Sequence, residues 1–348
     1  MLDWRSAVTR IDALEDLELD AGLIGEMQQL RQGPPAGRDP FINFYVPSFK
    51  HFETDEIAAC GKNRFPAVSV TGGKCQLQCD HCKAKVLEGM RPAETPAELE
   101  RLVEEEFLPD GARGVLLSGG SNHQNVIDYP RYFPTIRRIK DRHPDFQIAM
   151  HTALVDEAYA AEMDAAGVDV AMLDIIGAQE TVQKVYHLKR PVEDFEKSLA
   201  ALTKTDMKVV PHIVLGLHYG EFLGEYNALE MIARHTPDAL ILVVTEPYFA
   251  PSSRPFKTPD ANQVGRFFKD ARLRMGGETP VLLGCARPGG PQRVVTDTYA
   301  VMAGLDGIAF PSDGMLELAD TLGLRHKTTP SCCSVIVGEE ILPVAETA

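Results

Sequence analysis

The sequence predicts an α/β fold in which eight strand–helix units form a barrel. From residue 65 onward, short apolar runs rich in β-branched residues alternate with longer amphipathic stretches. Continuous apolar runs are typical of parallel strands that are buried on both faces. Amphipathic stretches between such runs are typical of helices that cover a parallel sheet. Alternating units of this number predict a (β/α)8 barrel.

The predicted elements follow one another without a gap in the pattern. The strands are expected at 65–71, 114–118, 147–152, 169–176, 208–216, 238–245, 279–284 and 306–311. The helices are expected at 95–107, 128–142, 155–166, 193–205, 222–236, 260–275, 291–304 and 315–323. Thr95 and Asp128 are residue types that begin helices, because their side chains accept hydrogen bonds from first-turn amides.

Two segments flank the predicted barrel, which spans residues 65–325. Residues 1–64 form an N-terminal extension, with one or two amphipathic helices at 5–32 and an irregular lead-in at 34–64. Aromatic residues crowd in this lead-in, which predicts a plug against one end of the barrel; the alternative is a wall of an active-site channel. These aromatics are Phe41, Phe44, Tyr45, Phe49 and Phe52. Residues 326–348 form a C-terminal tail that carries cysteines.

Composition excludes several classes of partner. The chain has 348 residues, 44% of them hydrophobic, and a formal net charge of −15. Phosphates repel an acidic surface, so neither a nucleic acid nor a bilayer is expected as a general partner. The N-terminus lacks the basic segment and apolar core of a signal peptide, so none is expected. The sequence also has no apolar run long enough for a membrane helix. Seven cysteines, three of them clustered, suit metal binding in a reducing, cytoplasmic compartment.

Cys75, Cys79 and Cys82 follow the first predicted strand with the spacing C-x3-C-x2-C. Three thiolates on one short loop form a soft site that suits zinc or an iron–sulfur cluster. Three local ligands hold three irons of a [4Fe–4S] cube and leave the fourth iron open, as a catalytic site requires. The alternatives are a zinc ribbon or buried cysteines, but a ribbon needs a second, similarly spaced pair, which the sequence lacks.

This motif after a strand resembles the signature of the radical S-adenosylmethionine (radical SAM) enzymes, with His81 in the position that is usually aromatic. The resemblance implies a TIM-type barrel, a [4Fe–4S] cluster and S-adenosylmethionine bound to the open iron. It further implies that one electron cleaves the sulfonium to a 5′-deoxyadenosyl radical, which abstracts a hydrogen atom. In such enzymes the cofactors carry the chemistry, and the protein supplies position and excludes water.

Chemistry in such barrels lies on the loops after the strands. After the second strand, Gly119-Gly120-Ser121 resembles the family's GGE-type motif, whose backbone receives the methionine amino group. Ser121 departs from the acidic third residue, but a backbone carbonyl can make this contact. At the third strand end, His151 is expected to be a structural hydrogen-bonding group.

Two later strand ends complete the predicted cosubstrate site. Asp174 ends the fourth strand, and a carboxylate within an apolar strand is costly unless paired, so we expect it in the site. In the family, a polar residue here contacts the ribose or the methionine carboxylate. After the fifth strand, Gly216 and Glu221 resemble the glycine-rich adenine-binding turn, although two additional residues interrupt the match.

Four cysteines lie outside the motif: Cys60, Cys285, Cys332 and Cys333. Each alone is commonly a small buried hydrophobic residue. Together they flank both ends of the barrel, which predicts an auxiliary cluster, with Ser331, Ser334 or Arg287 as possible further ligands. Adjacent side chains diverge in an extended chain, so Cys332 and Cys333 are not both expected to be ligands.

Several segments resemble the split, two-protein lipoyl synthases: KHFETDEI, FPAVSVTGGKCQLQCDHC, LGCARPGG and SCCS. The resemblance implies a sulfurtransferase that acts on the octanoyl chain of a lipoyl carrier protein. It implies as partners a second radical SAM lipoyl synthase component and an electron donor such as ferredoxin or flavodoxin. In biotin synthase and lipoyl synthase the auxiliary cluster is consumed as the sulfur donor. The alternatives are a biotin-synthase-type enzyme for a free small molecule and a non-catalytic iron–sulfur or zinc protein.

Overall fold

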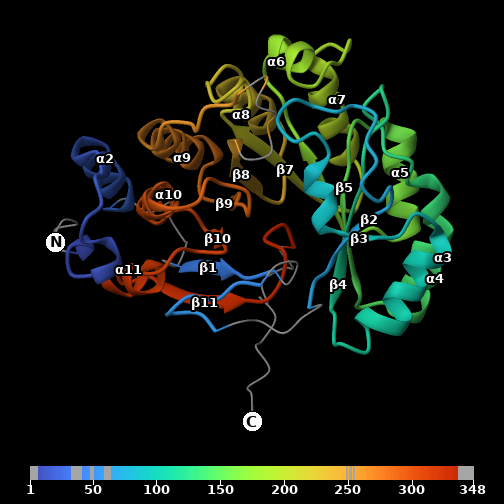
Figure 1. The fold of residues 1–348 in the computed structure, drawn as a ribbon, viewed down its shortest axis with the longest axis horizontal. Helices are drawn as coiled ribbons and strands as arrows, with labels where there is room; N and C mark the ends of the chain where they lie inside the picture. The colour runs from blue at the N-terminus through green and yellow to red at the C-terminus, as the bar shows by residue number, and fades with distance from the viewer. Residues whose placement is uncertain are drawn as a thin grey trace.

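One curved sheet of parallel strands organises the fold (Figure 1). The computed structural model describes residues 7–32, 41–47, 51–58, 64–247, 250, 253 and 255–335. Within these residues the sheet has eleven strands in the order β11-β1-β10-β9-β8-β7-β6-β5-β4-β2-β3. Its two edges, β3 (Arg91–Pro92) and β11 (Arg325–Thr329), do not pair with each other in the described part. The sheet therefore curls into a barrel without hydrogen bonds that close the ring.

All eight predicted strands are confirmed, and they neighbour one another in chain order. They are β2 (Ala67–Ser69), β4 (Gly114–Ser118), β5 (Gln147–His151), β6 (Val170–Asp174), β7 (Lys208–Leu215), β8 (Leu240–Val244), β9 (Val281–Leu283) and β10 (Gly307–Ala309). Their residues are buried almost throughout, because the barrel interior covers one face and the helices cover the other.

The helices cover the outer face of the sheet (Figure 1). They are α3 (Pro96–Arg101), α4 (Phe133–Arg142), α5 (Glu157–Ala166), α6 (Gln179–Lys184), α7 (Glu193–Leu202), α8 (Glu225–Ala233), α9 (Ala261–Met275), α10 (Pro291–Met302) and α11 (Met315–Thr321). Thr95 begins α3, as predicted, and the structure shows that it does so in a reciprocal capping box with Glu98. Among the described helices, none has the length and apolarity needed to cross a bilayer.

The prediction that Asp128 begins a helix is wrong. A short 3-10 helix at Pro130–Tyr132 comes first, and α4 begins at Phe133. A proline stands in the first turn of each helix, namely Pro130 and Pro134. Proline is favoured there because the first-turn amides lack helical acceptors in any case. Two such starts in succession divide the predicted helix.

The N-terminal extension contributes a strand to the sheet. β1 (Phe41–Tyr45) lies between β10 and β11, with Asn43 opposite Gly307 on one side and Lys327 on the other. The irregular conformation predicted for 34–64 is therefore wrong at β1. Helix α2 (Ala21–Gln32) packs against α9 and α10, and the Tyr299 hydroxyl accepts a hydrogen bond from the Asp20 amide.

The aromatic residues of the lead-in have different positions. Phe44 and Tyr45 are buried in β1, and Phe52 packs on Phe310 with ring centroids 5.1 Å apart. Phe41 is half-buried, and Phe49 lies outside the described residues. Phe44 and Tyr45 therefore belong to a strand of the sheet, and the plug predicted against one end of the barrel is wrong for them.

A fully buried ion pair fixes the loops after β9 and β10. Arg287 and Asp297 form two hydrogen bonds, of 2.6 and 2.9 Å, and both side chains are inaccessible to solvent. The guanidinium also donates to the carbonyls of Gly284, Ala309 and Phe310. Every part of this charge pair is satisfied, so it ties two strand ends to α10. Arg287 is thereby occupied in a structural role, and the expectation that it is available as a cluster ligand is wrong.

We predict that Asp297→Ala lowers the free energy of unfolding by about 3–5 kcal/mol, because Arg287 would remain charged and buried without its partner. The measurement is urea denaturation of the metal-free protein. The matched control is Glu230→Ala, which removes the partner of Arg274 in an exposed ion pair and is expected to cost about 1 kcal/mol or less. Equal losses for the two variants would contradict the assignment.

Candidate active site

The three cysteines of the motif lie on the loop that follows β2. Cys79 is buried, whereas Cys75 and Cys82 are half-buried. Burial, followed by the neighbouring thiols of Cys82 and Cys75, raises the pKa of Cys79 well above its usual value. Burial likewise raises the pKa of Cys82 to about 11. The three sulfur atoms thus face a common, poorly solvated space in which a cation would stabilise the thiolates.

The donor set fits an iron–sulfur cluster, because three soft thiolates come from one short loop. A cubic cluster binds each thiolate through a different iron. His81, between two of the cysteines, has a buried Nδ1 without a hydrogen-bond partner. This orphaned atom marks a place where a polar group of a bound cofactor can be received.

The glycines after β4 allow the cysteine loop to pack closely. A Cβ at Gly120 would lie 2.0 Å from the Lys74 carbonyl oxygen and 2.6 Å from Cys75 Cα. The Gly120 amide donates to Thr71 Oγ1 at 2.7 Å. Next to it, the Ser121 carbonyl accepts from the Gln76 amide at 2.9 Å. Glycine is therefore required here for loop packing, whether or not the same backbone also contacts a cofactor.

The buried carboxylate of Asp80, between Cys79 and Cys82, holds the cysteine loop to two other loops. Its Oδ1 lies 2.9 Å from Lys83 Nζ and 3.0 Å from His187 Nε2. Its Oδ2 accepts a hydrogen bond of 2.9 Å from the Tyr219 hydroxyl. His187 follows α6, and Tyr219 lies in the turn after β7. One side chain, 2% exposed, therefore joins the loops after β2, β6 and β7.

The partners of Asp80 have unusual backbone conformations. Lys83, His187 and Tyr219 have φ angles of 45°, 58° and 56°. A non-glycine residue pays roughly 1 kcal/mol or more for this left-handed region, and it persists only where other contacts compensate. The three residues direct their polar atoms to the same carboxylate. We conclude that the Asp80 contacts offset this strain.

A polar group lies inside the barrel at the ends of β5, β6 and β7. His151 Nε2 and Asp174 Oδ1 are 3.7 Å apart, and the rings of His151 and His212 have centroids 5.4 Å apart. Burial lowers the pKa of His212 to about 4, so this ring is neutral. Burial also acts against the charge of His151, but its contact with Asp174 raises the pKa above the usual value. The pairing partner expected for Asp174 is thus His151, and His212 is a member of the group that the sequence did not reveal.

The turn after β7 is organised by Glu225. This buried carboxylate accepts hydrogen bonds from the amides of Gly216, Leu223 and Gly224, at 2.9, 2.8 and 3.0 Å. Burial raises the pKa of Glu225. Glu221, the predicted cofactor contact, is 66% exposed and lies 3.5 Å from Lys257. The sequence shows both glutamates, but it does not show which one the fold buries.

The C-terminal cysteines reach the interior of the barrel. Cys332 and Cys333 are buried among Ala149, Met172 and Val210, the inward-facing residues of β5, β6 and β7. Figure 1 shows the red segment after β11 turning into the centre of the curved sheet. Half-buried Cys285, at the end of β9, packs against the same cluster. Cys60 lies outside the described residues.

Cys332 and Cys333 do not diverge, and the expectation that they point apart is wrong. A hydrogen bond from the Cys333 thiol lowers the pKa of Cys332, and the same contact raises that of Cys333. The chain turns here, because the Val335 amide bonds to the Cys332 carbonyl at 3.0 Å. In a turn, unlike a strand, successive side chains can face the same space. Ser334 Oγ lies 3.5 Å from His212 Nε2, so it too enters this region.

A family model matches the part of the chain that holds the cysteine motif, and solved structures have a similar fold. Residues 69–225 match the family model of the Radical SAM superfamily. No curated protein matches the chain in sequence. The crystal structure of methylornithine synthase (PylB) is similar with a TM-score of 0.54 and 14% identity, over 93% of each chain.

A second similar structure is that of HydG, a maturase of the [FeFe]-hydrogenase. It has a TM-score of 0.55 and 14% identity, over 84% of this chain and 62% of HydG. The structure of HydG from Carboxydothermus hydrogenoformans has a TM-score of 0.51 and 13% sequence identity, over 88% of this chain and 67% of HydG. At such identities the likeness shows the fold alone.

We predict that Asp80→Asn lowers the free energy of unfolding by about 1–3 kcal/mol, because the amide cannot satisfy three converging donors. We also expect less iron per chain after anaerobic reconstitution, since the cysteine loop loses its anchor. The matched control is Glu94→Gln, which weakens the exposed contact of Glu94 with Lys74 on the same loop. Parental stability and iron content in Asp80→Asn would show that the loop does not depend on this carboxylate.

Proposed function

We propose that the chain is a radical SAM enzyme that inserts sulfur into an octanoyl chain, on the support of the family-model match over residues 69–225 and of the cysteine motif within it. Membership of the superfamily implies a [4Fe–4S] cluster and S-adenosylmethionine. When bound, these cofactors supply an adenosyl radical that abstracts a hydrogen atom. In this proposal Cys75, Cys79 and Cys82 hold the cluster.

The chain's own residues shape the space around the cofactors. Asp80 holds the cysteine loop in place, and Gly120 lets that loop approach the end of β4. Asp174, paired with His151, offers a carboxylate toward the barrel interior, where it can accept hydrogen bonds from hydroxyl or ammonium groups. The apolar interior around Met172 and Val210 excludes water from the reacting atoms.

One observation carries the choice of sulfur insertion: Cys332 and Cys333 are buried in the apolar cluster inside the barrel, and Cys285 packs against the same cluster. A charge on Cys285 raises the pKa of Cys333, and a charge on His151 lowers the pKa of Cys332. The two C-terminal thiols therefore adjoin the polar end of the barrel. A second sulfur-rich site within the reaction space is what an auxiliary cluster that donates sulfur needs. We propose these three residues as its ligands, with Cys60 as a further candidate.

The partners in this proposal rest on the sequence resemblance. The octanoyl chain would arrive on a lipoyl carrier protein, a second radical SAM component would complete lipoyl synthesis, and ferredoxin or flavodoxin would supply electrons. The cytoplasm belongs to this proposal because the cysteine content suits a reducing compartment. Activity on an octanoylated carrier domain, with none on free small molecules, is the result that supports this assignment.

A second candidate function is a radical reaction on a free small molecule. The similarity to methylornithine synthase extends over 93% of both chains, which favours a comparable barrel with a substrate space of similar position. Turnover of a free metabolite, together with no reaction of an octanoylated carrier domain, would select this candidate instead.

Cys75→Ala is expected to abolish 5′-deoxyadenosine formation, because two thiolates do not hold the cluster in its catalytic geometry. Formation is measured anaerobically with dithionite and S-adenosylmethionine, by chromatography. Cys285→Ala is the matched control: it should retain 5′-deoxyadenosine formation but give no sulfur-containing product. Formation at the parental rate in Cys75→Ala would remove the central claim.

Iron and sulfide analysis tests the second site separately. After anaerobic reconstitution we expect roughly eight irons per chain in the parent and roughly four in the double variant Cys285→Ala/Cys332→Ala. Four irons in both proteins would leave the radical cluster intact and contradict the auxiliary cluster. Bound zinc without iron in the parent would contradict both clusters.

A further inference from the structure

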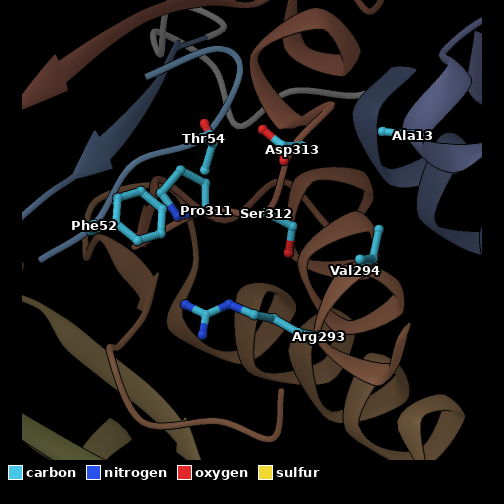
Figure 2. Close-up of a pocket in the computed structure, with 8 residues that line it drawn as sticks. All are labelled: Ala13, Phe52, Thr54, Arg293, Val294, Pro311, Ser312 and Asp313. Atoms are coloured by element: carbon cyan, nitrogen blue, oxygen red, sulfur yellow. The ribbon is translucent and has the colours of Figure 1, made fainter. Parts of the chain in front are cut away.

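A pocket of about 440 Å³ opens at the carboxyl end of the barrel strands, and no residue of the cysteine loop lines it. Figure 2 shows the residues that do. Its walls come from segments that follow β1, β9 and β10, together with the N-terminal extension. The lining residues are Ala13, Phe52, Thr54, Arg293, Val294, Pro311, Ser312 and Asp313. A volume of this size accommodates a small organic molecule.

Arg293 gives the pocket an incompletely paired cation. Its side chain is half-buried and reaches across the pocket below Pro311 and Phe52 (Figure 2). Within the described residues, its guanidinium donates to one acceptor, the Phe310 carbonyl at 2.6 Å, and forms no ion pair. Burial lowers the pKa of Arg293 to about 10, which still leaves it charged at neutral pH. A guanidinium has five N–H donors, so most of them remain available to a ligand.

The carboxylates near Arg293 are engaged elsewhere. Asp297 pairs with Arg287 and also accepts hydrogen bonds from the amide and hydroxyl of Ser312. Asp313 accepts a hydrogen bond of 2.8 Å from the Asp55 amide and lies apart from the guanidinium (Figure 2). The charges of Asp297 and Glu246 partly oppose the effect of burial on the pKa of Arg293, but within the described residues neither carboxylate forms an ion pair with it. An anion in the pocket can therefore make the direct ion pair that Arg293 lacks there.

The remaining walls suit hydrocarbon. Phe52 packs on Phe310, and Val294, Pro311 and Ala13 add aliphatic surface. The carboxylate of Asp313 lines the pocket away from the Arg293 guanidinium. Because like charges repel, it disfavours a second negative group on the ligand. The chemistry of the pocket is thus one oxyanion-binding cation beside an apolar surface.

The position of the pocket also favours a ligand. Counting from β2, β9 and β10 are the seventh and eighth barrel strands. In (β/α)8 barrels the loops after these two strands frequently hold the anionic group of a substrate.

We propose that this pocket binds a small organic acid, whose carboxylate pairs with Arg293 while its hydrocarbon part lies against Phe52, Val294 and Pro311. A guanidinium matches a carboxylate with two parallel hydrogen bonds. A phosphate monoester offers related oxyanion chemistry, but its second charge is opposed by Asp313. The proposal concerns a ligand other than S-adenosylmethionine and does not depend on sulfur insertion.

The test is calorimetric titration of the full chain with hexanoate, hexylamine and inorganic phosphate. We expect hexanoate to bind the parent and hexylamine not to bind. Arg293→Gln should weaken hexanoate binding at least about tenfold, because the charged pair is lost. The matched control is Arg274→Gln, which removes the same charge from an exposed arginine of α9 and should bind hexanoate as the parent does.

A second variant tests the pocket without changing its charge. Val294→Phe narrows the apolar wall and should weaken hexanoate binding while leaving the thermal unfolding midpoint within a few degrees of the parent. Hexanoate binding that survives both Arg293→Gln and Val294→Phe overturns the proposal, as does equal binding of hexylamine. Phosphate that binds more tightly than hexanoate overturns the choice of a carboxylate ligand.

Discussion

The carboxylate of Asp80 is the constraint on which the arrangement of the active site depends. Loops are the least regular part of a barrel, yet here three of them must meet at one place. Asp80 joins the loops after β2, β6 and β7 by contacts of 2.9 to 3.0 Å. Because the carboxylate is buried, losing one partner costs more than the same loss would cost at the surface. The cysteine motif therefore includes a structural anchor between its second and third cysteines.

The barrel interior has two chemical regions. Toward the amino ends of the strands it is apolar, with Val170, Val210 and Ile241. Toward the carboxyl ends it holds His151, Asp174 and His212, together with the thiols that the C-terminal segment brings in. Burying so many polar groups is unfavourable unless each finds a partner or a ligand. This concentration of polar groups and thiols inside an otherwise apolar barrel is the physical reason for placing the chemistry here.

The loops after β9 and β10, at the carboxyl end of the barrel, are held by a different ion pair. Arg287 and Asp297 fix the loops after β9 and β10, and the Arg287 guanidinium uses its N–H donors in these contacts. Arg293, six residues further on, forms no ion pair within the described residues, although the charges of Asp297 and Glu246 act on it. The two arginines look equivalent in the sequence, but one supports the fold and the other faces a pocket. Both donate to the Phe310 carbonyl, but only Arg287 also bonds to Asp297 and to the carbonyls of Gly284 and Ala309.

The sequence by itself determined the eight strands, the helices between them and the loop that carries the three cysteines. These features follow from local patterns: apolar runs, amphipathic spacing, the capping box at Thr95 and the close spacing of the cysteines. The tertiary structure decided which distant segments meet. It placed β1 between β10 and β11, brought Cys332 and Cys333 into the barrel, gave Asp80 its partners, and buried Glu225 rather than Glu221. Such contacts depend on chain closure over tens to hundreds of residues, and no local periodicity encodes them.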